Sequence, residues 1–275
     1  MTIEKFKSLF KYDWDKVGYV GIERECFITD MDGGIVPTAQ KVLSGLERGI
    51  HTDERSLSYW GIVRPEKGAF GYELSACQIE SRVGPCCLAD LQPNLKYREE
   101  QLKAALHHYG LLALHTEVGP EDMPLDIYPD PTGRYQKITK DMPRKILLAA
   151  CRVIGTHVHI GMRDHDMALR VYNHVIRHYA EFCELGNGSF GDRLAIYRQM
   201  APDFEPNPYA SWDEYYQTAV AKSFAEDPRK CWTLIRISVH GTIEFRMFGA
   251  TDSIGRIVKW ATQCRDLCQA ASASL

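Results

Sequence analysis

Several features that mark other protein classes are missing from this chain of 275 residues. No uninterrupted apolar run approaches the ~18 residues of a membrane-spanning helix, so we expect no membrane partner. The first residues have no apolar core of the signal-peptide kind, which favours a cytoplasmic location. The 33 basic and 36 acidic residues nearly balance, so the chain lacks the basic footprint of a nucleic-acid-binding protein.

Several motifs that would carry a particular chemistry are also missing. The pattern GxxxxGK[ST] is absent and no GxGxxG follows a predicted strand. If the protein uses ATP, neither of these glycine-rich loops binds its phosphates. No GxSxG marks a nucleophilic serine. The nine cysteines form no CxxC pair, which favours reduced thiols in a packed core over a disulfide framework.

The hydrophobic patterning predicts an α+β protein with a mainly antiparallel sheet. Strands are predicted at residues 17–28, 70–83, 111–117, 151–162, 231–239 and 242–248. Helices are predicted at residues 38–49, 90–109, 134–149, 166–185, 211–225 and 252–271, with a long loop at 186–210. Along the sequence, single strands and pairs of strands are separated by helices without a regular βαβ alternation, which favours the α+β class. We expect one domain over residues 1–275, with an N-terminal segment at 1–16 and a frayed tail at 271–275.

Four predicted strands carry polar residues two positions apart, which places each pair on one strand face. The pairs are Glu23 and Glu25, Gln78 and Glu80, His157 and His159, and Glu244 and Arg246. Any single pair is also typical of a solvated strand face. If the four strands belong to one sheet and these faces converge, four carboxylates meet in one cleft, and such a cluster either takes up protons or binds cations.

Carboxylates with an occasional imidazole suit the hard ions Mg²⁺ and Mn²⁺ better than zinc. Arg246 would lie beside such ions as a fixed cation suited to a phosphate oxygen. Metal ions and an arginine around a phosphate are typical of phosphoryl transfer. Other arginines that could line the cleft, each also compatible with a surface position, are Arg134, Arg198 and Arg236.

Five segments in order resemble the carboxylate–amine ligases of glutamate–cysteine ligase family 2. They are GIERE at 21–25, QIESRVGPC at 78–86, RYQ at 134–136, GTHVHIG at 155–161 and GTIEFR at 241–246. The ExE, HVH and ExR strands also look, more distantly, like the metal strands of glutamine synthetase. The resemblance covers about residues 17 to 270. It implies a single catalytic domain built on a curved, mainly antiparallel sheet funnel with helices outside.

The resemblance also implies roles for individual residues. Glu23, His157 and Glu244 match one metal site, and Glu25 and Glu80 match ligands of another, for two or more Mg²⁺ or Mn²⁺ ions. Arg246 matches the arginine near the transferred γ-phosphate. The resemblance further implies that the catalytic residues are Glu25, Glu244 and Arg246. His159 and Arg236 match positions that contact nucleotide phosphates or substrate. Residues expected to bind substrate are Arg134, Tyr135, Ser189 and Arg198.

The implied reaction joins a carboxylate, such as the side chain of glutamate, to an amine. ATP phosphorylates the carboxylate, and the amine then displaces phosphate from the acyl phosphate. The expected partners are ATP and small amino-acid or amine substrates, with a homo-oligomer possible.

Some positions depart from the family pattern. The chain ends sooner than family members commonly do, and Ala76 stands where the family often has a further acid. Glu73 is nearby, but strand parity with Glu80 predicts that it faces away. Two other hypotheses therefore stay open: a zinc-dependent hydrolase that uses His157 and His159, and a non-catalytic binding protein on the same scaffold. Stoichiometric zinc would favour the first, and ATP binding without turnover would favour the second.

Overall fold

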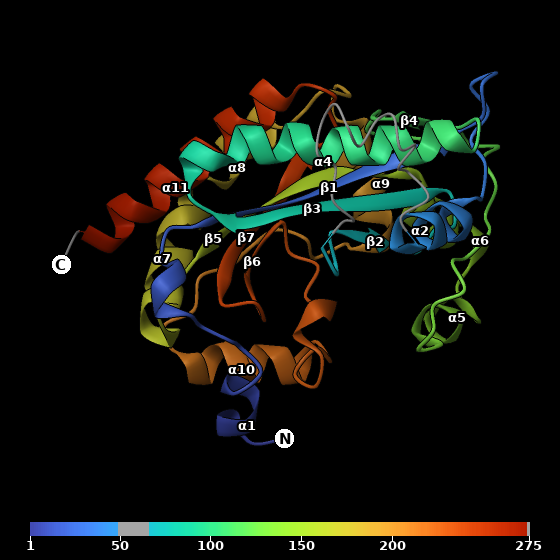
Figure 1. Cartoon of the computed structure of the whole chain (residues 1–275). Coiled ribbons are helices and arrows are strands. Elements are labelled where there is room, and N and C mark those ends of the chain that lie inside the picture. The colour runs from blue at the N-terminus through green and yellow to red at the C-terminus, as the bar shows by residue number, and fades with distance from the viewer. Residues whose placement is uncertain (49–65, 274–275) are drawn as a thin grey trace.

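A sheet of antiparallel strands forms the centre of the molecule (Figure 1). The computed structural model describes residues 1–48 and 66–273. The strands are β1 (Val20–Thr29), β2 (Phe70–Tyr72), β3 (Gln78–Cys86), β4 (Leu112–Leu114), β5 (Gly155–Gly161), β6 (Ile235–Ser238) and β7 (Thr242–Gly249). Their order is β2-β3-β1-β5-β7-β6, and β4 also pairs with β1. Every strand pair within these described ranges is antiparallel, which confirms the predicted α+β class.

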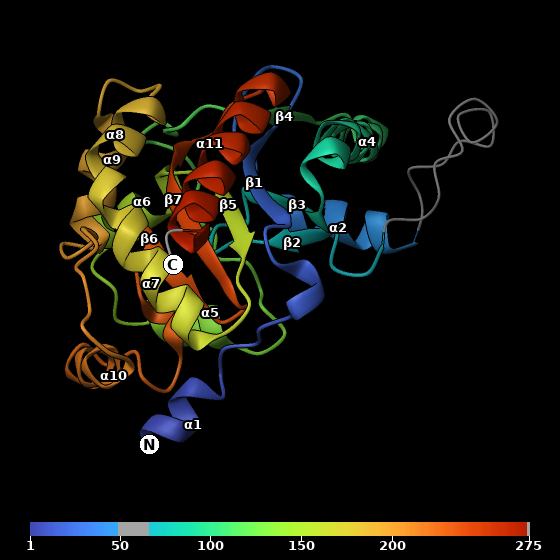
Figure 2. The same ribbon diagram turned by 90° about the vertical axis from the view of Figure 1, so that its left-hand side faces the viewer.

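Helices surround this sheet and cover one of its faces (Figures 1 and 2). They are α1 (Ile3–Lys7), α2 (Ala39–Arg48), α4 (Leu88–His108), α5 (Arg134–Thr139), α6 (Arg144–Arg152), α7 (His165–Val175), α8 (Tyr179–Leu185), α9 (Asp192–Met200), α10 (Trp212–Ala221) and α11 (Ile254–Ala273). Helices α4, α7, α8 and α11 pack on the sheet. None of the helices within 1–48 and 66–273 is long and apolar enough to span a bilayer.

The core lies between the sheet and these covering helices. Alternate residues of the strands point toward the helices, among them Ile22 of β1, Val158 of β5 and Phe245 of β7, all fully buried. Phe248 stacks on Trp260 of α11 with ring centroids 4.8 Å apart. Because the helices take up the apolar side chains, the other strand face is left for polar ones.

The first residues are tied to the body of the protein through α10, beside which α1 lies in both views (Figures 1 and 2). Phe6 is fully buried and meets Tyr215 of α10 edge-on at 5.5 Å. The hydroxyl of Ser211 accepts a hydrogen bond from the backbone N–H of Glu214 and caps α10.

The segment 70–83 was expected to be one strand, and that prediction is wrong. The structure divides it into β2 and β3, which pair with each other. Between them Ala76 donates its N–H to the carbonyl of Asp126, and Ser75 forms an isolated bridge with Ile127. These contacts with a distant segment bend the chain out of the sheet. The strand also extends beyond its predicted end at residue 83, since β3 continues through Gly84 and Pro85 to Cys86.

One loop prediction and two helix predictions also need correction. The predicted loop 186–210 contains helix α9, whose first turn is held by a hydrogen bond from the N–H of Arg193 to the hydroxyl of Ser189. The predicted helix 134–149 is interrupted before Pro143, which precedes α6 and has no N–H to continue α5. The predicted helix 166–185 is divided into α7 and α8 by a short 3₁₀ turn at Ile176–His178.

Candidate active site

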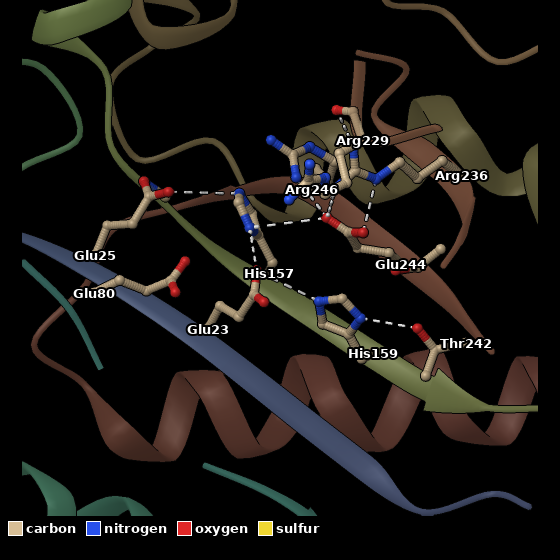
Figure 3. A network of polar contacts seen from close by, with 12 residues as sticks. Glu23, Glu25, Glu80, His157, His159, Arg229, Arg236, Thr242, Glu244 and Arg246 are labelled. Carbon is tan, nitrogen blue, oxygen red and sulfur yellow. Dashed lines mark hydrogen bonds and ion pairs between the residues drawn. The ribbon is translucent and has the colours of Figure 1, made fainter. Parts of the chain in front are cut away.

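The paired residues other than Gln78 meet on the sheet face opposite α4, α7, α8 and α11 (Figure 3). Gln78 instead donates a hydrogen bond to the carbonyl of Cys151 at 2.8 Å. In the strand register Glu25 is opposite Glu80, Glu23 is opposite His157, and Glu244 is opposite His159. Residues directly opposite one another in an antiparallel pair point to the same face. The register therefore brings together these side chains, which the i, i+2 spacing selected.

These side chains line a cavity of about 420 Å³. The sheet supplies its charged floor, on which Glu244 is fully buried and Glu80, His157 and His159 are each less than a tenth exposed. Arg134 and Tyr135 of α5 also line it, so the predicted substrate residues on that helix lie beside the carboxylates.

Three groups of side chains within the described ranges bring potential metal-ligand atoms within 4.8 Å of one another. They are Glu23 with His159 and Glu244, Glu23 with Glu80 and His157, and Glu25 with Glu73 and Glu80. This partition differs from the expected one, which placed His157 with Glu244. Nδ1 of His157 lies 3.1 Å from Glu23 but 4.0 Å from Glu244. Both histidines are therefore candidate ligands.

Glu73 belongs to the site, although strand parity predicted that it faces away. The parity argument fails because the chain leaves the sheet between β2 and β3. Burial, which is the larger cause, and the negative charge of Glu25, which is the smaller one, together raise the pKa of Glu73 to about 8. Burial and the charge of Glu23 likewise raise the pKa of Glu80 well above its ordinary value. Carboxylates held this close favour a bound cation or a shared proton.

The residues fit a divalent metal ion of the Mg²⁺ or Mn²⁺ type. Nε2 of His159 is buried, makes no hydrogen bond and lies 3.5 Å from Oε2 of Glu23, while Nδ1 contacts the hydroxyl of Thr242 at 2.9 Å. The donor groups hold two or three carboxylates each and at most one imidazole. Hard cations prefer such oxygen-rich sets, whereas the zinc hydrolase alternative needs more nitrogen or sulfur donors.

Two arginines hold Glu244. Arg236 donates to both carboxylate oxygens, at 2.7 and 3.0 Å, and Nη1 of Arg246 donates to Oε1. Burial would raise the pKa of Glu244, but the adjacent Arg236 and Arg246 outweigh it and hold that pKa well below the usual range. Glu244 therefore stays ionised in the interior.

The two arginines differ in the donors they have left. Arg236 also donates to the carbonyls of Arg229 and Cys231, so its guanidinium is largely committed within the protein. Nε of Arg246 is buried and has no hydrogen-bond partner. Arg246 is thus the better placed of the two to receive an anionic ligand, and the phosphate contact expected for Arg236 stays a prediction.

A second cavity of about 1210 Å³ adjoins the first and shares Glu73, Arg82, Arg134, Tyr135 and Arg229 with it. Ser189 and Arg198 line neither cavity. The hydroxyl of Ser189 accepts a hydrogen bond from the N–H of Arg193 in the first turn of α9, and Arg198 pairs with Glu205 at the surface. Their substrate contacts stay a prediction.

Arg193 is a further residue that the sequence did not single out. Its buried guanidinium donates to the carbonyls of Ile154, Met247 and Arg246 at 2.8, 3.1 and 3.2 Å. It thereby ties the end of β7 to the start of β5, where the N–H of Gly155 donates to Glu25 at 2.6 Å. The signal was hidden because the residue lies in a segment predicted as loop.

Similarity to known proteins extends over most of the chain. No protein-family model matches the chain. A protein of Thermobifida fusca named "Putative glutamate–cysteine ligase 2" is 24% identical over 288 residues, which cover 98% of this chain and 66% of that protein. The "Glutamate–cysteine ligase" of Natronomonas pharaonis is 25% identical over 250 residues, covering 85% of this chain and 64% of that protein. The resemblance to glutamate–cysteine ligases is confirmed.

The fold is also confirmed by a solved structure. A bifunctional glutathione synthetase from Pasteurella multocida superposes with a TM-score of 0.59 at 13% identity, over 96% of this chain and 40% of that chain. The chain thus spans 66% or less of the length of these ligase-like proteins. At these identities the comparisons establish resemblance and fold, while the activity has to be argued from the site.

Proposed function

We propose that the protein is an ATP-dependent carboxylate–amine ligase that forms an amide bond through an acyl phosphate. The observation that carries this proposal is the position of Arg246, with its unpaired Nε, beside three overlapping groups of metal ligands. Metal ions and an arginine around the same small cavity are suited to the charge on a transferred phosphoryl group.

The chain's residues divide the work of that reaction. Glu23, Glu25, Glu73, Glu80, His157, His159 and Glu244 would hold the metal ions. When bound, those ions would neutralise the charge of the ATP phosphates. Arg246 would bind an oxygen of the γ-phosphate, and Arg236 would keep Glu244 ionised and oriented. Arg134 and Tyr135 would contact the substrate from α5.

The chemistry proceeds in two balanced steps. An oxygen of the substrate carboxylate attacks the γ-phosphorus, and the bond from phosphorus to the β-phosphate oxygen breaks, which gives an acyl phosphate and ADP. The amine nitrogen then attacks the acyl carbon, phosphate leaves with the electron pair of the carbon–oxygen bond, and the nitrogen loses a proton. Because water would also attack the acyl phosphate, the reaction needs a site from which the bound substrates exclude water. Glutamate or a related amino acid is the proposed carboxylate.

The proposal is tested by measuring nucleotide products with Mg²⁺, ATP, L-glutamate and a panel of amines. We expect ADP and phosphate in equal amounts, formed together with an amide. AMP and pyrophosphate would contradict the role of Arg246, since they indicate an acyl adenylate. Tight ATP binding without turnover for any pair would favour the non-catalytic alternative.

A further inference from the structure

One side of the 420 Å³ cavity is apolar and is not used by the proposed phosphoryl transfer. Ile138 of α5, Met142 of the connecting turn, and Ile146 and Ala150 of α6 line it. Ile138 is 38% exposed, while Met142, Ile146 and Ala150 are half-buried, so this apolar wall is not packed into the core.

Two further side chains extend this apolar wall toward the charged floor. Met200, at the end of α9, and Trp232, before β6, both line the same cavity. The Trp232 ring is 43% exposed, and its centroid lies 5.9 Å from Cζ of Arg246. The wall therefore begins next to the arginine proposed to hold the transferred phosphate.

This position determines what can occupy the wall. The adenine base of ATP is separated from its γ-phosphate by the ribose and two other phosphates, so the base does not lie beside Arg246. A group packed on Trp232 belongs instead to one of the two molecules that meet at the acyl carbon. The carboxylate substrate is an anion, for which Arg134 and Arg229 on the same cavity are the suited partners.

We propose that the amine substrate carries an aliphatic or aromatic group that binds against this wall, next to Arg246. This inference rests on the proposed ligase function. The wall would hold the substrate by burying the apolar surface of that group.

The test is the binding of three primary amines, ethylamine, n-butylamine and benzylamine, measured by titration calorimetry on the whole chain with Mg²⁺. We expect affinity to rise along the series, by up to about fourfold for each methylene that contacts the wall. Ile146→Ala and Trp232→Ala should each weaken benzylamine binding about tenfold, because each removes apolar contact area. Circular dichroism checks that both variants are folded.

Two matched control variants lie outside both cavities. Val220 of α10 is 49% exposed and Trp14 is 68% exposed, so Val220→Ala and Trp14→Ala should leave benzylamine binding unchanged. Equal affinity for ethylamine and benzylamine, or no saturable binding of any amine, would overturn the inference.

Because binding is measured without turnover, the outcome is separate from that of the proposed function. If apolar amines bind at the wall but no pair of substrates releases ADP, the proposed ligase function is refuted and the apolar binding site is retained. If ethylamine supports ADP release and butylamine binds no more tightly than ethylamine, the inference of an apolar amine substrate is refuted and the proposed ligase function is retained.

Discussion

On strand β7, Phe245 and Glu244 are neighbours in the chain and are both fully buried, yet they belong to opposite faces of the sheet. Phe245 faces the helices and packs on Phe182, with ring centroids 5.4 Å apart. Glu244 faces the cavity and is held by two arginines. Burying an aromatic ring stabilises the fold, whereas burying an ion pair costs desolvation that the attraction only partly returns. The comparison shows that burial alone does not separate apolar residues that stabilise the core from charged residues that line a cavity.

The largest expected effect is on stability and comes from the helix-covered face. Phe245→Ala should lower the free energy of unfolding by about 3–5 kcal/mol, because it removes a fully buried ring and leaves a cavity. Urea unfolding followed by circular dichroism measures this change. A loss below about 1 kcal/mol would show that the helix face is loosely packed at this strand.

The neighbouring substitution should act on turnover instead. Glu244→Gln keeps the size of the side chain but removes the charge that pairs with Arg246 and is proposed to bind a metal ion. We expect turnover to fall roughly 10²-fold or more, as when an electrostatic contact to the transition state is lost. The variant should unfold at higher urea than Phe245→Ala. Near-normal ADP release at saturating Mg²⁺ would remove Glu244 from the site.

A sharper version of the comparison uses the two histidines of β5. Because each belongs to a group of potential ligands, His157→Ala and His159→Ala should both raise the Mg²⁺ concentration for half-maximal activity, by about tenfold. Mg²⁺ and ATP titrations of each variant separate metal binding from nucleotide binding. A His159→Ala variant that changes only the KM for ATP would restore the role expected from the sequence, a phosphate contact.

The smallest effect is expected far from the cavity. The carboxylate of Asp164 accepts a hydrogen bond from the N–H of Met167 at 2.8 Å and caps α7 on the helix-covered side. Asp164→Ala should therefore cost about 0.5–2 kcal/mol of stability and leave the Mg²⁺ and ATP dependence of turnover unchanged. Thermal unfolding and a kinetic assay on the same preparation check both parts. An altered Mg²⁺ dependence would mean that α7 influences the site.

The charged face was predictable to the extent that it follows from strand periodicity. Side chains two apart on one strand share a face regardless of the neighbouring strands, so Glu23 and Glu25 could be paired from the sequence. The division of ligands into groups could not. It depends on the register of β5 against β7, which places Glu244 opposite His159 and not opposite His157.

The residues that the sequence missed depend on contacts between distant segments. Glu73 reaches the site because Ala76 bonds to Asp126, about fifty residues along the chain, and the strand is broken there. Arg193 matters because its guanidinium reaches carbonyls of β7 and of the residue before β5. No local pattern encodes either contact, so propensity and periodicity placed Glu73 on the wrong face and Arg193 in a loop.

The central claim, that the open face of the sheet binds divalent metal ions together with ATP, is tested most directly by an Mn²⁺ titration followed by electron paramagnetic resonance. Glu23 is the informative position, because it belongs to two of the three ligand groups. We predict saturable binding of at least one Mn²⁺ ion that tightens when ATP is added and weakens tenfold or more in Glu23→Gln. Mn²⁺ binding that is absent, or equal in the two proteins with and without ATP, would contradict the claim.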